Sequence, residues 1–166
     1  TSSKKFKSKF NKKVKFITPK KKISEDLNLR FKYLLCLYLL LKFIIKNKNS
    51  LVLSFQANIY CILLCKLFSI KIITRSNSSP SGWYHNFIKK FIYKKIVSFA
   101  NLVIVNSFEF KKEMKKEFDI DSTCIYNPLN KKEILDKSKK SIKFNFFKKK
   151  NDLKIINVGR LVEQKN

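Results

Sequence analysis

The sequence predicts an α/β protein built on a parallel β-sheet with helices on both faces. Three observations lead to this prediction: short apolar runs typical of buried strands, longer segments with helical periodicity, and regular alternation of the two along 166 residues. Strands that alternate with crossover helices form parallel sheets, so a Rossmann-like architecture is expected. The length suffices for one sizeable core and is short for two complete α/β domains.

The predicted strands are short apolar runs, most of them followed by a polar turn. They occupy residues 14–18 (VKFIT), 51–55 (LVLSF), 70–74 (IKIIT), 102–105 (LVIV), 123–126 (TCIY) and 153–158 (LKIINV).

The predicted helices fill the intervals between these strands. They occupy residues 25–46, 57–68, 84–100, 108–118 and 131–140. Ser24 is a suitable N-cap for the first helix because Glu25 and Asp26 then complement the positive end of the helix dipole.

In two of these helices the spacing of the side chains also predicts which residues share a face. In residues 84–100 the isoleucines form one stripe with lysines opposite, which indicates an amphipathic helix. In residues 108–118, capped by Asn106 and Ser107, Glu109 and Glu113 are expected to pair with lysines at helical spacing.

The chain is strongly basic, with 38 Lys and Arg residues against 11 Asp and Glu residues and a net charge of +27. Such a charge favours polyanionic neighbours: nucleic acid, an anionic membrane surface, or phosphorylated small molecules. The frequent Lys, Asn, Ile and Phe residues are equally typical of an AT-rich coding sequence, which needs no polyanionic partner. Both interpretations remain open from composition alone.

The cysteines and the longest apolar run indicate a cytoplasmic protein. Four cysteines lie in apolar segments without a Cys-x-x-Cys pair and with a single histidine, His85, so buried reduced thiols are expected and no metal. Residues 33–45 are apolar but include Lys42 and fall short of the roughly 20 residues that cross a bilayer. The first residues lack the apolar region of a signal peptide, and their start without Met suggests a cut.

Several common active-site motifs are excluded by residue content. The chain has only two glycines, Gly82 and Gly159, so neither a G-x-G-x-x-G loop nor a Walker A loop is present. No G-x-S-x-G motif accompanies His85, so a serine hydrolase is not expected.

Polar residues gather where the predicted strands end, which is where parallel sheets bind ligands. They are Gln56, Asn58, Arg75, Asn77, Asn106, Ser107, Asn127 and Arg160. The guanidinium of Arg75 suits a phosphate, a carboxylate or sugar hydroxyls. The alternative for Arg75 is a loop arginine that pairs with a carboxylate or caps a helix.

The order of the motifs SFQAN, ITRSN, LVIVNSFEFKKEM, CIYNPLN and KIINVGRLVEQKN resembles glycosyltransferase family 4 of the GT-B group. The resemblance covers residues 51–166 and is strongest in the last two motifs. It implies that residues 1–150 form an N-terminal acceptor domain without its first strand. Residues 151–166 would be the first strand and loop of a truncated donor domain.

The resemblance also implies roles for particular residues. Arg160 and Lys165 would hold the diphosphate of a nucleotide sugar, which needs no metal or other cofactor. On the acceptor side, the cleft would be lined by Ser54, Gln56, Asn58, Arg75 and Asn77. The implied enzyme is a retaining hexosyltransferase of cell-envelope polysaccharide or lipopolysaccharide biosynthesis, with a glycan or lipid-linked acceptor.

Three features of the family pattern are missing: the glycine-rich loop after the first strand, a histidine near residues 75–77, and the paired-glutamate motif of the donor domain. We therefore expect the 166-residue chain alone to be inactive. The lysines of residues 4–22 and 89–95 predict salt-sensitive contact with anionic lipid at the inner face of the cell membrane. The alternatives are a basic nucleic-acid-binding protein, disfavoured because its charges form no single patch, and a non-catalytic gene remnant.

Overall fold

The computed structural model describes residues 8, 10–19, 27–55, 58–140, 153 and 155. The chain divides into two compact units, Thr1–Asn127 and Pro128–Asn166. The predicted domain boundary at residues 150–151 falls outside the described residues and stays a prediction.

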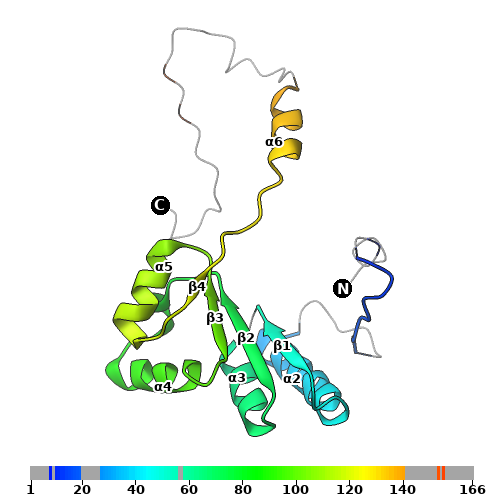
Figure 1. Cartoon of the computed structure of the whole chain (residues 1–166), viewed down its shortest axis with the longest axis vertical. Coiled ribbons are helices and arrows are strands. Elements are labelled where there is room, and N and C mark those ends of the chain that lie inside the picture. Colours follow the sequence, from blue (N-terminus) through cyan, green and yellow to red (C-terminus); the bar gives the residue numbers. More distant parts are fainter. Residues whose placement is uncertain are drawn as a thin grey trace. The chain divides into compact units, whose positions relative to one another are not determined.

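The first unit contains a four-stranded parallel sheet in the order β1-β2-β3-β4 (Figure 1). The strands are β1 (Leu51–Ser54), β2 (Lys71–Ser76), β3 (Leu102–Val105) and β4 (Thr123–Cys124). All three neighbouring pairs are parallel. The predicted α/β fold, a Rossmann-like parallel sheet flanked by helices, is confirmed.

One helix precedes the first strand, helical segments connect the strands, and one further helix lies in the second unit. They are α2 (Leu29–Lys46), α3 (Asn58–Leu67), the 3₁₀ turn η1 (Pro80–Trp83), α4 (Phe87–Val97), α5 (Phe108–Glu113), the π-helical turn η2 (Met114–Phe118) and α6 (Lys131–Ser138). Because the strand order is sequential and parallel crossovers are right-handed, α3, α4 and α5 belong to one face of the sheet.

Burial alternates along β2 and distinguishes its two faces, whereas Val103, Ile104 and Val105 of β3 are all buried. Ile72 and Val105 are buried on the face toward the helices. The sequence also predicts cover on the second face, and there Leu51 and Leu53 of β1 remain 60 % and 52 % exposed. The second face is therefore open at β1, whereas Ile104 of β3 on the same face is buried.

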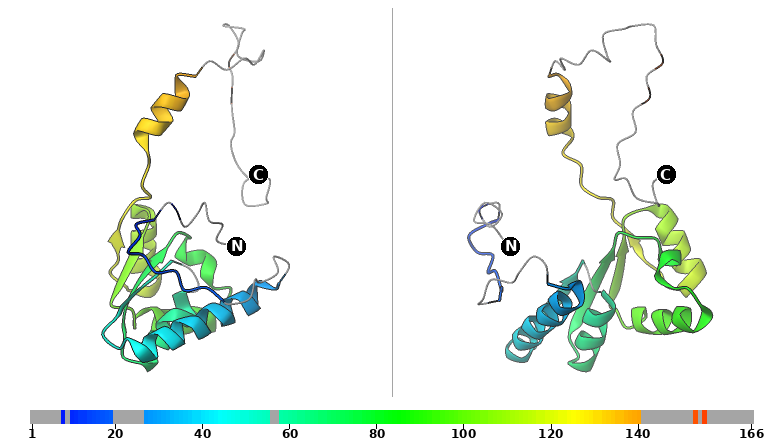
Figure 2. Two further views of the ribbon diagram at one scale, coloured as in Figure 1. Left: turned by 90° about the vertical axis from the view of Figure 1, so that its right-hand side faces the viewer. Right: turned by 180° about the vertical axis from the view of Figure 1, so that it is seen from behind.

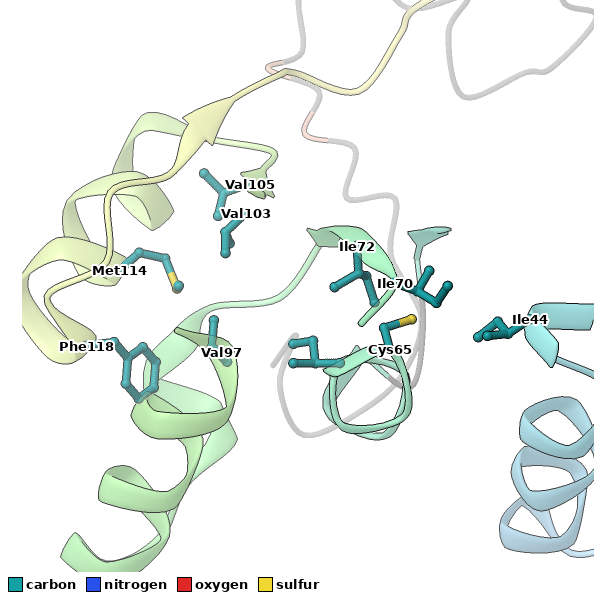
Figure 3. Close-up of a cluster of buried hydrophobic side chains, with 10 residues drawn as sticks. Ile44, Cys65, Ile70, Ile72, Val97, Val103, Val105, Met114 and Phe118 are labelled. Carbon is teal, nitrogen blue, oxygen red and sulfur yellow. The ribbon is translucent and has the colours of Figure 1, made fainter. Parts of the chain in front are cut away.

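The core lies between the face that carries Ile72 and Val105 and the helices (Figure 3). Ile44 of α2 and Cys65 of α3 pack near one end, and Val97 of α4 lies toward Met114 and Phe118 of η2. Each such apolar side chain contributes about 1.5–3 kcal/mol when fully buried. This core holds the helix layer against the strands whose carboxyl ends carry the polar residues.

Some element boundaries differ from the prediction. Residues 14–18 are not a strand, and the backbone N–H of Val14 instead donates to the carbonyl of Asn11 at 2.9 Å in a turn. Helix α2 begins at Leu29, capped by the side chain of Asn28, which accepts from the N–H of Arg30. The predicted cap at residues 24–26 and nearly all of the predicted strand 153–158 lie outside the described residues.

The predicted helix 108–118 is divided into α5 and the wider turn η2, which ends at Asp119 in the left-handed region with φ 56°. Glu113 accepts hydrogen bonds from serines and not from lysines. Among the described residues, the ion pairs at i,i+4 spacing are Lys115–Asp119 and Glu133–Lys137, so the predicted lysine partner of Glu113 was wrong. Glu109 forms none of the ion pairs in this part of the chain, but, besides hydrogen bonding to its own backbone, the charge of Lys112, at i,i+3 spacing, contributes to lowering its pKa.

Within the described residues, no helix combines the length and the apolarity that a bilayer-spanning segment requires. The four cysteines are free thiols, but only Cys65 is buried and Cys36 is exposed. The prediction of buried cysteines is therefore wrong for Cys36, because that part of α2 faces solvent.

Thiol labelling should distinguish these cysteines. Burial raises the pKa of the Cys65 thiol to about 11, and burial also raises the pKa of Cys61. Since the thiolate is the reactive form, a maleimide near neutral pH should label exposed Cys36 first and Cys65 only after unfolding. Mass spectrometry of the labelled peptides, with Cys36→Ser as control, checks this. Rapid native labelling of Cys65 would contradict it.

Candidate functional site

A pocket of about 590 Å³ lies at the carboxyl ends of β1 and β2. Parallel sheets bind ligands at this edge. The pocket has a polar rim and an apolar floor. Its rim includes Asn58, Arg75, Ser76, Asn77, Ser78, Gly82 and Trp83, and its floor includes Ile59, Ile62, Tyr93, Val97 and Val103.

Ser54 and Asn58 fix the geometry of the rim. The hydroxyl of Ser54 donates to Oδ1 of Asn58 at 2.7 Å, and Nδ2 of Asn58 donates to the carbonyl oxygen of Arg75 at 3.0 Å. Asn58, the first residue of α3, thus joins the end of β1 to the end of β2. Its amide retains one further N–H and one further lone pair for a ligand.

Arg75 is the cation among the described residues that line the pocket, and it alternates along β2 with Thr74 and Ser76, so its side chain leaves the strand on the face opposite theirs. It is the second-last residue of β2, which extends past the predicted strand end. Its Nη2 donates to the carbonyl of Ile125 at 3.1 Å and to Oδ1 of Asn127 at 2.8 Å, and its Nε lies 3.5 Å from Oδ1 of Asn77. Arg75 therefore spans β3 to reach the segment after β4.

The positive charge of Arg75 is held by neutral groups. The ion pairs in the described part of the chain involve lysines, and none of them includes Arg75. Neither alternative considered from sequence, a carboxylate pair or a helix cap, describes this arginine. A cation whose described partners are a carbonyl and amides is available to an anionic or hydroxyl-bearing ligand.

The loop after β2 forms a wall of the pocket. The hydroxyl of Ser76 donates to the carbonyl of Ser78 at 3.2 Å, and the indole Nε1–H of Trp83 donates to the hydroxyl of Ser78 at 3.0 Å. The ring of Trp83 stacks on Phe118, with centroids 5.7 Å apart. Trp83 is therefore fixed by a polar contact at its edge and by the core behind its face.

Two glutamates from α5 and η2 hold this loop. The hydroxyl of Ser79 donates to Oε2 of Glu113, the hydroxyl of Tyr84 donates to Oε2 of Glu117 at 2.6 Å, and Nζ of Lys90 lies 2.6 Å from the same oxygen. The hydrogen bond from Lys90 holds the pKa of Glu117 below its usual value. The same contact raises the pKa of Lys90 above its usual value.

The Lys90–Glu117 contact predicts a pH-dependent stability. Because the folded pKa of Glu117 is lowered, its contribution is present above the ordinary glutamate pKa of about 4.3 and is lost as the pH falls through the folded value. Because the folded pKa of Lys90 is raised, the stabilisation from this contact is also lost in alkaline solution, as the pH rises through that folded value. Wild type and Glu117→Gln should differ in melting temperature at neutral pH and converge in acid.

A matched control is Glu133→Gln, which removes an exposed i,i+4 pair with Lys137. Exposed pairs of this kind contribute little, so its effect on melting temperature should be smaller. Equal effects of the two variants at neutral pH would contradict a role of Glu117 in holding the loop.

Asn106 is a further polar residue at the sheet edge. Its Oδ1 is buried and has no hydrogen-bond donor among the described residues, whereas the hydroxyl of the adjacent Ser107 accepts from the N–H of Phe110 at the start of α5. Ser107 is thus the helix cap that the sequence predicts. The sequence predicts Asn106 as a second cap of this helix, but its side chain accepts no hydrogen bond from the first turn of α5.

The structure brings together Ser54, Asn58, Arg75 and Asn77 of the predicted acceptor-side residues. Gln56, Arg160 and Lys165 lie outside the described residues, so the diphosphate site stays a prediction.

Sequence reasoning missed Trp83, Glu113 and Glu117 as parts of the pocket wall and its support. Glu113 and Glu117 are one helical turn apart, which indicates a shared face, but their partners lie 27 to 34 residues away in sequence.

No group of three His, Cys, Asp or Glu side chains is placed to bind a metal within the described part of the chain. No protein-family model matches the chain, and no curated protein sequence matches it at a significant level. The fold and the pocket together define an α/β domain. The described residues at the carboxyl edge of its sheet supply one cation, several neutral hydrogen-bonding groups and an indole.

Proposed function

We propose that this chain is the acceptor-binding domain of a retaining GT-B glycosyltransferase. The enzyme transfers a sugar from a nucleotide sugar to a glycan or lipid-linked acceptor in envelope polysaccharide or lipopolysaccharide biosynthesis. The observation that carries the proposal is Arg75 at the edge of the pocket, with no carboxylate partner among the described residues and with Asn77 within 3.5 Å of its Nε. The motif order of the sequence supports the same class.

The chemistry of the pocket suits a sugar. Sugar hydroxyls both donate and accept hydrogen bonds, and so do the amides of Asn58 and Asn77. The guanidinium adds charge-assisted donors for hydroxyl oxygens or for an acidic substituent. Pockets that combine apolar surface with a few placed polar groups orient small ligands, and the indole of Trp83 supplies such surface.

The donor side of the proposal depends on Arg160 and Lys165. Two fixed cations beside a departing diphosphate stabilise the negative charge that develops on it. The reaction so described needs no metal or other cofactor, and it takes place in the cytoplasm.

The test is a transfer assay with the full-length gene product. Radiolabelled UDP-glucose, UDP-N-acetylglucosamine and GDP-mannose are each incubated with envelope glycan and lipid extracts, and incorporation into glycan is measured. We expect incorporation from one donor, and none from the 166-residue chain alone. Absence of incorporation together with salt-dependent retention of RNA would instead favour the nucleic-acid-binding alternative.

A further inference from the structure

Helix α4 presents an apolar stripe to solvent. Phe87, Ile88, Phe91 and Ile92 are 81 %, 69 %, 63 % and 48 % exposed. At about 100° per residue these positions span an arc of about 140° on one side of the helix. A surface helix usually turns such a stripe toward the core, so the exposure of this face of α4 means that no described element covers it.

Contacts on the opposite side fix this orientation. Val97 is buried in the core, Tyr93 lies 6.4 Å from the ring of Trp83, and Lys90 is paired with Glu117. The sequence places the isoleucines on one face with the lysines opposite. In the structure Lys90 lies on the inner side, whereas Ile88 and Ile92 lie on the outer side. The helix lies at the margin of the helix layer (Figure 2).

The charges around the stripe have one sign. Lys89, Lys94 and Lys95 are exposed, and the sequence of α4, FIKKFIYKKIV, contains no acidic residue. Asp119, the carboxylate whose pKa is influenced by Lys94, is itself bound by Lys115 at 3.0 Å. The exposed face therefore combines aromatic and aliphatic side chains with exposed lysines and has no acidic residue of α4.

We infer that this face of α4 binds an anionic lipid bilayer, with Phe87 and Phe91 inserted at the level of the headgroups. A helix with an apolar face and a lysine-rich border lies in the plane of a membrane interface, and its affinity combines apolar burial with attraction to anionic lipid. Lysine stems follow the apolar surface while their ammonium groups remain at the headgroups.

Charge also argues against other segments of the same chain, and against a second copy, as the occupant of this face. Residues 141–150 (SIKFNFFKKK) contain four lysines and no acidic residue, and residues 1–7 (TSSKKFK) also carry only positive charge. A second copy would bring the same lysines to the contact. Like charges in contact are unfavourable, whereas an anionic surface complements all of them. The inference rests on exposure and charge and is independent of the proposed sugar transfer.

The experiment is co-sedimentation of the 166-residue chain with phosphatidylcholine vesicles, with and without an equal part of phosphatidylglycerol. We expect binding to the anionic vesicles that weakens with added salt. Phe87→Ser/Phe91→Ser should weaken it about tenfold or more through lost apolar burial. Lys89→Gln/Lys95→Gln should weaken it about fivefold per lysine.

Matched controls separate this face from the general charge of the chain. Phe108→Ser/Leu129→Ser removes two exposed apolar side chains from other places, and Lys132→Gln/Lys139→Gln removes two exposed charges from other places. Both control variants should bind nearly as wild type does. An indole introduced by Phe91→Trp should shift to shorter emission wavelength with anionic vesicles, and one introduced by Leu129→Trp should not.

Three results would overturn the inference. Equal loss in the α4 and control variants would mean non-specific adsorption. Equal binding to neutral vesicles, or none to either kind, would exclude an anionic bilayer. Self-association in sedimentation velocity that is lost in Phe87→Ser/Phe91→Ser, without vesicle binding, would assign the face to a second copy.

Discussion

Phe118→Ala should lower the free energy of unfolding by about 3 to 5 kcal/mol, the range for large-to-small aromatic substitutions in protein cores. Phe118 is fully buried at the end of η2. Its ring stacks on Trp83 and meets Tyr84 edge to face at a centroid distance of 5.9 Å (Figure 3 shows its place in the core). Its removal leaves a cavity directly behind the loop that borders the pocket.

Urea unfolding followed by tryptophan emission measures this effect, because Trp83 is the only tryptophan of the chain. The matched control is Phe87→Ala, which removes the same ring from a site that is 81 % exposed, so the unfolding free energy should hardly change. Similar losses in the two variants would contradict the burial of Phe118. Emission of native Phe118→Ala should also shift to longer wavelength, since Trp83 loses its stacking partner.

The strands and the sheet were predictable because they depend on local signals. Apolar runs such as LVIV at residues 102–105 become strands, and their alternation with helices specifies parallel pairing. Residues 14–18 carry a similar pattern but pair with no strand among the described residues. A run of β-branched and aromatic residues becomes a strand only where a partner edge is available, and sequence spacing does not report that.

The orientation of α4 was not predictable for a related reason. Periodicity identifies a stripe but not the surface that covers it. Here the contacts of Val97 and Lys90, with partners in the core and in η2, decide which side faces inward.

The candidate site was partly predictable. Asn58, Arg75 and Asn77 follow from the rule that ligands bind at the carboxyl ends of parallel strands. The roles of Trp83, Glu113 and Glu117 depend on contacts between distant elements. Arg75 illustrates the difference. Its position at the sheet edge follows from the strand that precedes it, whereas its contacts with Ile125 and Asn127 join residues far apart in the sequence.

Arg75→Gln should reduce ligand binding strongly while leaving stability nearly unchanged. Hydrogen bonds to a charged group contribute about 1.5–3 kcal/mol, which corresponds to roughly tenfold to more than hundredfold in affinity. The partners that Arg75 would release, the carbonyl of Ile125 and the amide of Asn127, belong to exposed residues and can bind water instead. Affinity and unfolding free energy should therefore respond differently.

The measurement uses the full-length protein and the acceptor that the transfer assay identifies, with Trp83 emission as the binding signal and urea unfolding in parallel. Arg75→Lys keeps the charge but lacks the planar fork, so its affinity should fall between those of wild type and Arg75→Gln. Arg30→Gln, which removes an exposed arginine from α2, is the matched control and should bind as wild type does. If Arg75→Gln instead destabilised the fold and left acceptor affinity intact, Arg75 would be a structural tie between β2 and the segment after β4. The proposed acceptor site would then lose the observation that carries it.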